Sequence, residues 1–236
     1  MEGGPVTEPA QAPIQVVVAI DGPSGSGKST VSKEIARRLN LGYLDTGAMY
    51  RAVTWWAMHE GTDFAEPSAV VEAARNAPVE ISTDPDHQFV RVGGTDVTDA
   101  IRTPEVTSQV SSVATVPAAR EVLVQRQRGI IADSGRRIVA EGRDITTVVA
   151  PDAEARILLV ASEQARMNRR GAQLGGSQDA EALRQQVVGR DAKDSTVVNF
   201  STAADGVVTL DNSELTLEQS VTAVMDLVLR AVPDLA

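Results

Sequence analysis

A glycine-rich segment near the start of the chain carries residue types that bind phosphate. Residues 22–29 have the sequence Gly-Pro-Ser-Gly-Ser-Gly-Lys-Ser, which fits the pattern G-x-x-x-x-G-K-[ST]. The glycines let consecutive backbone N–H groups turn toward one phosphate, the lysine neutralises the outer phosphate oxygens, and the last serine hydroxyl is a ligand for Mg²⁺. The segment therefore predicts a site for a nucleoside triphosphate and Mg²⁺. The predicted site comprises Gly22, Pro23, Ser24, Gly25, Ser26, Gly27, Lys28, Ser29 and Thr30, with Ser29 as the metal ligand.

Two further segments carry charged side chains close to the ends of predicted strands. Arg51 lies one turn into a helix expected near residues 47–59, just after a short strand. The sequence Glu-Gly-Arg-Asp at 141–144 follows a strand expected at 137–140. The carboxyl ends of parallel strands share one edge of a sheet, and the planar arginine fork binds phosphate through two hydrogen bonds. Arg51 and Arg143 therefore predict a second anion site facing the first.

The elements that position these residues alternate between β-branched runs and helical patterns. Strands are expected at 15–20, 43–44, 137–140, 156–160 and 207–210, and helices at 29–39, 47–59, 67–75, 104–113, 117–133, 162–171, 179–192 and 216–231. This alternation predicts an α/β fold with a parallel sheet and helices on both faces. Residues 79–101 differ, because three short strands at 79–83, 88–92 and 95–97 are separated by turn residues. They predict a small antiparallel insert.

Composition limits the remaining classes of protein. The chain has 236 residues, no cysteine, two histidines and a net charge of −10. A disulfide scaffold and thiolate chemistry are excluded, and the acidic balance argues against binding to a nucleic-acid backbone. The apolar runs are too short to span a bilayer, and residues 1–13 lack the basic and apolar regions of a signal peptide. We expect a disordered tail at 1–13 and a cytoplasmic protein with no membrane partner.

The phosphate-binding pattern does not fix the reaction, because many activities share it. A switch GTPase is disfavoured, since no N-K-x-D-like segment follows a later strand, and a motor ATPase is disfavoured because the strand at 157–160 ends in Ala161-Ser162. A kinase for another acceptor, such as AMP, GMP, UMP or shikimate, stays open, with Asp45 or Asp144 as the base for a hydroxyl acceptor. A nucleotide sensor without turnover also stays open.

Six segments together resemble the bacterial cytidylate kinases in their order and spacing. They are the phosphate loop and residues 45–51, 101–106, 126–128, 141–144 and 190–195, and the resemblance covers about residues 14–231. It implies a three-layer P-loop NTPase fold with a small antiparallel monophosphate-binding insert and a helical lid. It further implies one nucleoside monophosphate kinase domain at 14–236, with a core at 14–64 and 117–236, the insert at 65–116 and the lid at 166–196.

The same resemblance implies that the γ-phosphate of Mg-ATP passes to CMP or dCMP, in a chain expected to be a monomer. Lys28, Arg143 and Arg170 would be catalytic. The acceptor site would comprise Thr46, Arg51, Ser111, Arg120, Arg143, Asp144, Arg190 and Asp194. In this scheme Arg51 and Arg143 bind the acceptor phosphate, Ser111, Arg120 and Asp144 bind the cytosine, and Thr46, Arg190 and Asp194 lie near the ribose or the lid. Arg166, Arg169 and Arg170 match the family's lid arginines.

Overall fold

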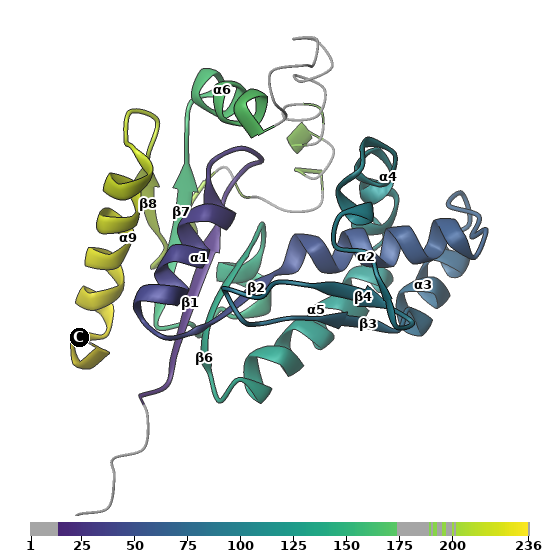
Figure 1. Ribbon diagram of the computed structural model, residues 1–236, viewed down its shortest axis with the longest axis horizontal. Coiled ribbons are helices and arrows are strands. Elements are labelled where there is room, and N and C mark those ends of the chain that lie inside the picture. The colour runs from purple at the N-terminus through teal and green to yellow at the C-terminus, as the bar shows by residue number, and fades with distance from the viewer. Residues whose placement is uncertain are drawn as a thin grey trace, which may run out of the picture.

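A parallel sheet forms the centre of the molecule. The computed structural model describes residues 14–173, 189, 191–192, 195–196, 200 and 202–235. Within these residues a five-stranded parallel sheet has the strand order β2-β6-β1-β7-β8 (Figure 1). Its strands are β1 (Val16–Asp21), β2 (Gly42–Asp45), β6 (Arg137–Gly142), β7 (Ala155–Val160) and β8 (Val208–Asp211). The predicted parallel sheet is confirmed.

Helices cover both faces of this sheet because alternate strand residues point to opposite sides. In β1, Val16, Val18 and Ile20 pack with α1 (Lys28–Arg38) and α9 (Leu217–Ala231). Val17 and Ala19 pack on the other face with α2 (Thr46–His59), α4 (Pro104–Ala114) and α5 (Pro117–Asp133). All six residues of β1 are buried, as expected of a parallel strand covered on both faces. The predicted three-layer α/β fold is confirmed.

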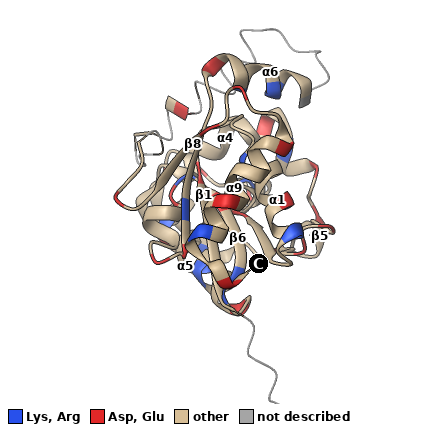
Figure 2. Cartoon of the chain, turned by 90° about the vertical axis from the view of Figure 1, so that its left-hand side faces the viewer, with Lys and Arg blue, Asp and Glu red and all other residues tan. Residues whose placement is uncertain are grey.

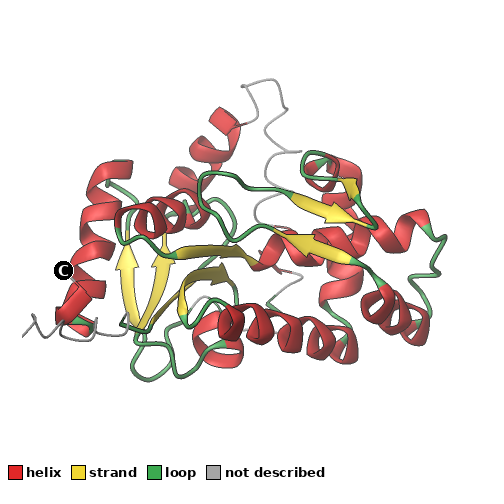
Figure 3. Ribbon diagram, turned by 60° about the horizontal axis from the view of Figure 1, so that its bottom comes forward, coloured by secondary structure: helices red, strands yellow, loops and turns green. Residues whose placement is uncertain are grey.

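A small antiparallel sheet packs against α2, as predicted for residues 79–101. It consists of β3 (Val79–Ile81), β4 (Val90–Val92) and β5 (Thr95–Asp96), and it lies with α3 (Pro67–Asn76) and α4 to the right of the central sheet in Figure 1. Figure 3, in which the strands are yellow, shows the strands of the small sheet to the right of those of the central sheet. Strands β3 and β4 are shorter than predicted at the ends that face the turn between them. The Asp84 carboxylate accepts hydrogen bonds from two backbone N–H groups of its own turn, so the connecting turn is wider.

Strand β6 is two residues longer than predicted, which changes the position of Glu141. In the register of the sheet Glu141 pairs with Ile20 of β1 and Asp45 of β2, so it is part of the strand and not of the following loop. After β6 comes a π-helical turn, η2 (Ile145–Val149), which the sequence did not predict. The buried Asp21 carboxylate fixes this turn by accepting hydrogen bonds from Ile145 N (2.9 Å), Thr146 N (2.8 Å) and Thr146 Oγ1 (2.6 Å).

The C-terminal half continues from β7 into α6 (Glu163–Gln173), and further on into β8 and α9. The predicted tail at 1–13, most of the predicted helix at 179–192, and Arg190 and Asp194 lie outside the described residues. In the described part of the chain no helix is long and apolar enough to cross a membrane. On the side of the molecule shown in Figure 2, acidic and basic residues are interspersed.

Candidate active site

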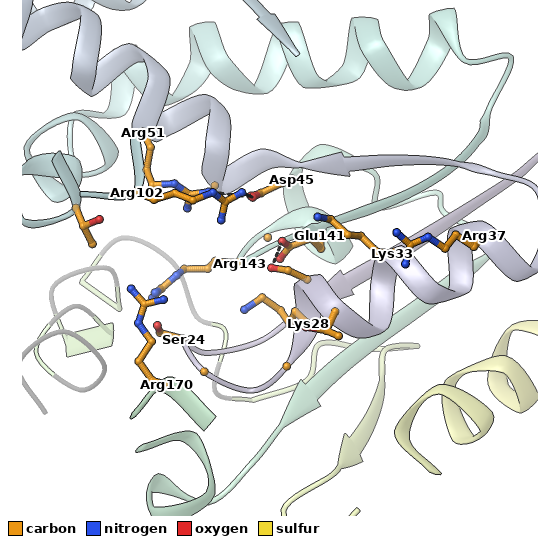
Figure 4. Close-up of a pocket in the computed structure, with 17 residues that line it drawn as sticks. Ser24, Lys28, Lys33, Arg37, Asp45, Arg51, Arg102, Glu141, Arg143 and Arg170 are labelled. Atoms are coloured by element: carbon orange, nitrogen blue, oxygen red, sulfur yellow. Dashed lines mark hydrogen bonds and ion pairs between the residues drawn. The ribbon is translucent and has the colours of Figure 1, made fainter. Parts of the chain in front are cut away.

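The carboxyl ends of β1, β2 and β6 meet at one cleft with a volume of about 680 Å³ (Figure 4). This is the edge of an open α/β sheet where ligands are usually bound. The phosphate loop follows β1, α2 follows β2, and Arg143 follows β6. The cleft is lined by Ser24, Gly25, Gly27, Lys28, Ser29, Thr30, Lys33, Arg37, Asp45, Gly47, Arg51, Arg102, Thr107, Glu141, Gly142, Arg143 and Arg170.

The phosphate loop, residues 22–29, turns tightly between β1 and α1. Only glycine fits at its first position, because a Cβ on Gly22 would overlap the carbonyl oxygen of Leu159 on β7. At the other end Gly27 has φ +91° and caps α1. The Lys28 ammonium donates to the Pro23 carbonyl at 2.9 Å, and burial lowers the pKa of Lys28. A buried ammonium at the start of a helix is a favourable place for an anion.

Two side chains from distant parts of the chain hold the back of the loop. The buried Asn212 amide, just after β8, donates to the Ser26 carbonyl at 3.0 Å. The Arg169 guanidinium on α6 donates to the same carbonyl at 3.1 Å and to Oδ1 of Asn212 at 2.9 Å. Arg169 thus supports the loop backbone, and in this arrangement it does not line the cleft.

The oxygens of Ser29 and Glu141 lie together at the loop. The Ser29 hydroxyl donates to Oε1 of Glu141 at 2.6 Å, and the Tyr43 hydroxyl donates to the same atom at 3.2 Å. Burial raises the pKa of the Glu141 carboxyl, and the nearby negative charge of Asp45 raises it further. Mg²⁺ takes oxygen ligands, so the Ser29 hydroxyl, with the Glu141 carboxylate behind it, fits the predicted metal.

A second wall of the cleft carries arginines held by a buried carboxylate. Asp45 caps α2 by accepting from Ala48 N at 2.8 Å, and it pairs with Arg51 at 2.9 Å and with Arg102 at 3.8 Å. Burial raises the pKa of Asp45, but the charges of these two arginines and the hydrogen bonds from Ala48 N and Arg51 together lower it overall. The ion pair therefore fixes the Arg51 guanidinium on the cleft wall.

Two more arginines reach the same cleft from other elements. Arg143 pairs with Asp191 at 2.9 Å, and its guanidinium lies over the Phe200 ring, 4.5 Å from the centroid. Arg170 comes from α6, and its pKa is lowered first by burial and then by the charges of Arg51 and Arg102. Figure 4 shows the Arg143 and Arg170 side chains directed into the cleft beside the phosphate loop. The structure thus brings together Lys28, Arg51, Arg143 and Arg170.

Two of the residues predicted to bind the base, Arg120 and Asp144, form an ion pair, and Asp144 directly follows the cleft residue Arg143. Arg120 on α5 pairs with the buried Asp144 and also donates to the Ala114 carbonyl at 3.0 Å. The Arg120 guanidinium lies 5.8 Å from the centre of the Tyr50 ring, and Tyr50 precedes Arg51 in α2. Burial raises the pKa of Asp144, with Arg120 acting in the opposite direction. The described lining of the cleft does not include Arg120, Asp144 or Ser111, which is part of α4.

Other predicted or overlooked residues complete the site. Thr46 is buried, and its hydroxyl donates to the Glu141 carbonyl at 2.8 Å, so the structure does not bring it to the cleft surface. Sequence reasoning gave no site role to Glu141 or Arg102, although both stand in the segments that carried the family resemblance. It also missed Asn212 as a support of the loop. Asp45, a candidate base in the sequence, and Glu141 stand at the ends of neighbouring strands, and this position was the signal that could have found Glu141.

A phosphate loop at the edge of a parallel sheet, opposed by arginines from three other elements, defines a P-loop phosphotransferase. The model of the cytidylate kinase family matches residues 18–230 of this chain. The cytidylate kinase of Streptomyces avermitilis is 46% identical over 214 residues, covering 90% of this chain and 92% of that protein. The cytidylate kinase of Cutibacterium acnes is 47% identical and covers 90% and 96%. The chain therefore belongs to the cytidylate kinase family.

Solved structures give a more distant comparison. A crystal structure of an uncharacterized protein from Eubacterium ventriosum has a TM-score of 0.51 and 13% sequence identity, and the match covers 91% of this chain and 98% of that one. At this identity the likeness supports the fold alone.

Proposed function

We propose that this protein transfers the γ-phosphoryl group of Mg-ATP to CMP or dCMP, giving ADP and CDP or dCDP. The observation that carries the proposal is that Arg51 and Arg143 line the same cleft as Lys28 and Ser29. One half of the cleft suits a triphosphate donor, and the other half suits the phosphate of an acceptor.

The donor half is formed by the phosphate loop and its supports. Lys28 would neutralise the outer phosphates, and the triphosphate would add negative charge beside an ammonium whose pKa burial lowers. Ser29 would hold Mg²⁺, with Glu141 beside it as the carboxylate that orients the hydroxyl. When bound, Mg²⁺ neutralises charge on the phosphate oxygens during transfer.

The acceptor half needs positioning and positive charge. A nucleoside monophosphate is already anionic near neutral pH, so no general base has to remove a proton from it. Arg51, fixed by Asp45, and Arg143 would bind the acceptor phosphate, and Arg170 would neutralise charge on the phosphoryl group in transit. Excluding water from the cleft would prevent hydrolysis of ATP.

In this proposal the base is selected by Asp144, Arg120 and Ser111. The Asp144 carboxylate would accept a hydrogen bond from the cytosine 4-amino group, while Arg120 and Ser111 would donate to the ring acceptors. Uracil presents an oxygen where cytosine presents an amino group, so Asp144 disfavours it. The roles of Thr46, Arg190 and Asp194 near the ribose or the lid stay predictions. The division into a core, a monophosphate-binding insert at 65–116 and a lid at 166–196, the monomeric state and the cytoplasmic location also stay predictions.

The test is Mg²⁺-dependent formation of ADP from ATP with CMP, dCMP, UMP, AMP, GMP or no acceptor, each supplied separately. We expect rapid ADP formation with CMP and dCMP, and little with the other nucleotides or without acceptor. Equal rates with every nucleotide would contradict the assignment of the base-binding group. ATP binding without acceptor-dependent turnover would contradict the proposal and indicate that the protein is a nucleotide sensor.

A further inference from the structure

An aspartate lies among the groups that the proposed function reserves for phosphate. Asp191 Oδ1 accepts a hydrogen bond from the backbone N–H of Ser24 at 3.0 Å and pairs with Nη2 of Arg143 at 2.9 Å. Its other oxygen, Oδ2, pairs with Nη1 of Arg166 on α6. These contacts join the phosphate loop, the loop after β6 and α6 at one carboxylate.

The donors around Asp191 are the kind that bind phosphate oxygens. One is a backbone N–H of a glycine-rich loop, and two are guanidinium groups. Both arginines and the aspartate are largely removed from water, with side-chain exposures of 16% for Arg143, 12% for Arg166 and 13% for Asp191. The negative charge of Asp191 also acts on Lys28, whose pKa it raises against the dominant effect of burial. The carboxylate therefore lies where the loop N–H, Arg143 and Arg166 converge, and its charge acts on Lys28.

A phosphoryl group that passes from the loop to Arg143 needs the same donors. Two anions in this place would repel each other, so the Asp191 carboxylate and a phosphoryl group cannot both occupy it. The loop N–H and the two guanidinium groups now bind the two oxygens of a carboxylate. The same donors could instead bind the three terminal oxygens of a phosphoryl group.

We propose that Asp191 is an intramolecular anion that occupies the place of the transferring phosphoryl group, and that the γ-phosphate of ATP displaces it. The inference rests on the proposed function, because that function places the γ-phosphate between the loop and Arg143. In the protein without nucleotide, Asp191 keeps Arg143 and Arg166 paired and in place. ATP must break these contacts, whereas ADP, which has no γ-phosphate, leaves them intact.

The experiment compares the affinities of Mg-ATP and Mg-ADP, measured by calorimetry without acceptor, for the wild type and Asp191→Asn. Asparagine has nearly the same shape and can still accept from Ser24 N, but it removes the negative charge. We expect Asp191→Asn to bind ATP about tenfold more tightly and to change ADP binding by less than about twofold, because only the γ-phosphate meets Asp191. Asp226→Asn, an exposed residue of α9, makes the same change in net charge and should alter neither affinity.

The outcomes separate the inference from its alternatives. ATP binding that is unchanged or weaker in Asp191→Asn, or a parallel change for ATP and ADP, would overturn the displacement and leave Asp191 as a structural ion-pair partner. Asp191→Glu keeps the charge, so it should keep the wild-type ratio of the two affinities even if its stability falls. Failure of the proposed function would appear elsewhere, as wild-type protein that forms no ADP in response to CMP, and the two affinities would still report on Asp191.

Discussion

The Ser29 hydroxyl donates a 2.6 Å hydrogen bond to Oε1 of Glu141, which joins the first turn of α1 to the end of β6. Glu141 stands in the sheet between strands β1 and β2, so the backbone fixes its position. The hydroxyl that would bind Mg²⁺ is therefore oriented by a carboxylate on a rigid element. Supporting carboxylates of this kind strengthen metal binding even when they are not ligands themselves.

Glu141→Gln tests this relationship. The amide keeps an acceptor for Ser29 but loses the charge, so we expect the Mg²⁺ concentration for half-maximal rate to rise by about 10- to 100-fold. The affinity for ADP without Mg²⁺ should change little, while the gain in affinity on adding Mg²⁺ should fall. Glu121→Gln, at an exposed position on α5, is the matched control. A wild-type Mg²⁺ requirement in Glu141→Gln would show that Glu141 does not act on the metal site.

Arg143→Ala tests the acceptor site. Loss of the guanidinium that is proposed to bind the acceptor phosphate should raise the KM for CMP and lower kcat, with kcat/KM falling by about 100-fold or more. Steady-state kinetics with varied CMP at saturating ATP measure both effects. Arg230→Ala, at an exposed position on α9, removes the same charge and should behave as wild type. Unchanged kinetics in Arg143→Ala would refute the acceptor assignment.

Asp144→Asn tests selection of the base. Asparagine can turn an amide N–H toward the 4-oxo group of uracil, where the carboxylate only accepts hydrogen bonds. The ratio of kcat/KM for CMP to that for UMP should fall by at least about tenfold, because the buried carboxylate no longer penalises uracil. If the ratio stays at the wild-type value while overall activity falls, Asp144 serves only as the ion-pair partner of Arg120.

Asp21→Asn tests the support of the loop that carries Arg143 and Asp144. Burial raises the pKa of the folded Asp21 above the value of about 3.9 for an unfolded aspartate. The stability that this carboxyl contributes is therefore fully present below the unfolded pKa and is lost as pH rises through the folded pKa. Asparagine does not titrate. The difference in the free energy of unfolding between wild type and Asp21→Asn should thus shrink as pH rises from about 4 toward 7.

Urea denaturation at several pH values in that window measures the Asp21 effect. We expect the variant to be less stable by about 1–3 kcal/mol near pH 5, since three donors converge on the carboxylate. A stability difference that grows with pH would contradict the inference that the pKa of Asp21 is raised in the folded protein.

The sequence predicted the parts of this molecule that depend on local patterns. The phosphate loop, the strands of the parallel sheet and the positions of Arg51 and Arg143 follow from spacing along the chain. The contact of Asn212 with Ser26 and that of Asp191 with Ser24 join residues 186 and 167 positions apart. Short polar side chains of this kind leave no periodic pattern, so such contacts could not be predicted.

The extent of the parallel strands was also harder to predict than their existence. Glu141 is a charged residue in a buried strand, and it is stable there because Ser29 and Tyr43 donate to it. The π-helical turn after β6 depends on Asp21, a carboxylate on another strand. In both cases a tertiary hydrogen bond overrides the local preference.

In the proposed reaction the phosphoryl group passes directly from ATP to a cytidine monophosphate held by the opposing arginines. Incubation with ATP labelled at the γ-phosphate, together with CMP and Mg²⁺, followed by separation of the products, tests it most directly. We predict that the label appears in CDP in the same amount as ADP is formed. Label that appears in inorganic phosphate while CMP stays unchanged would contradict the account.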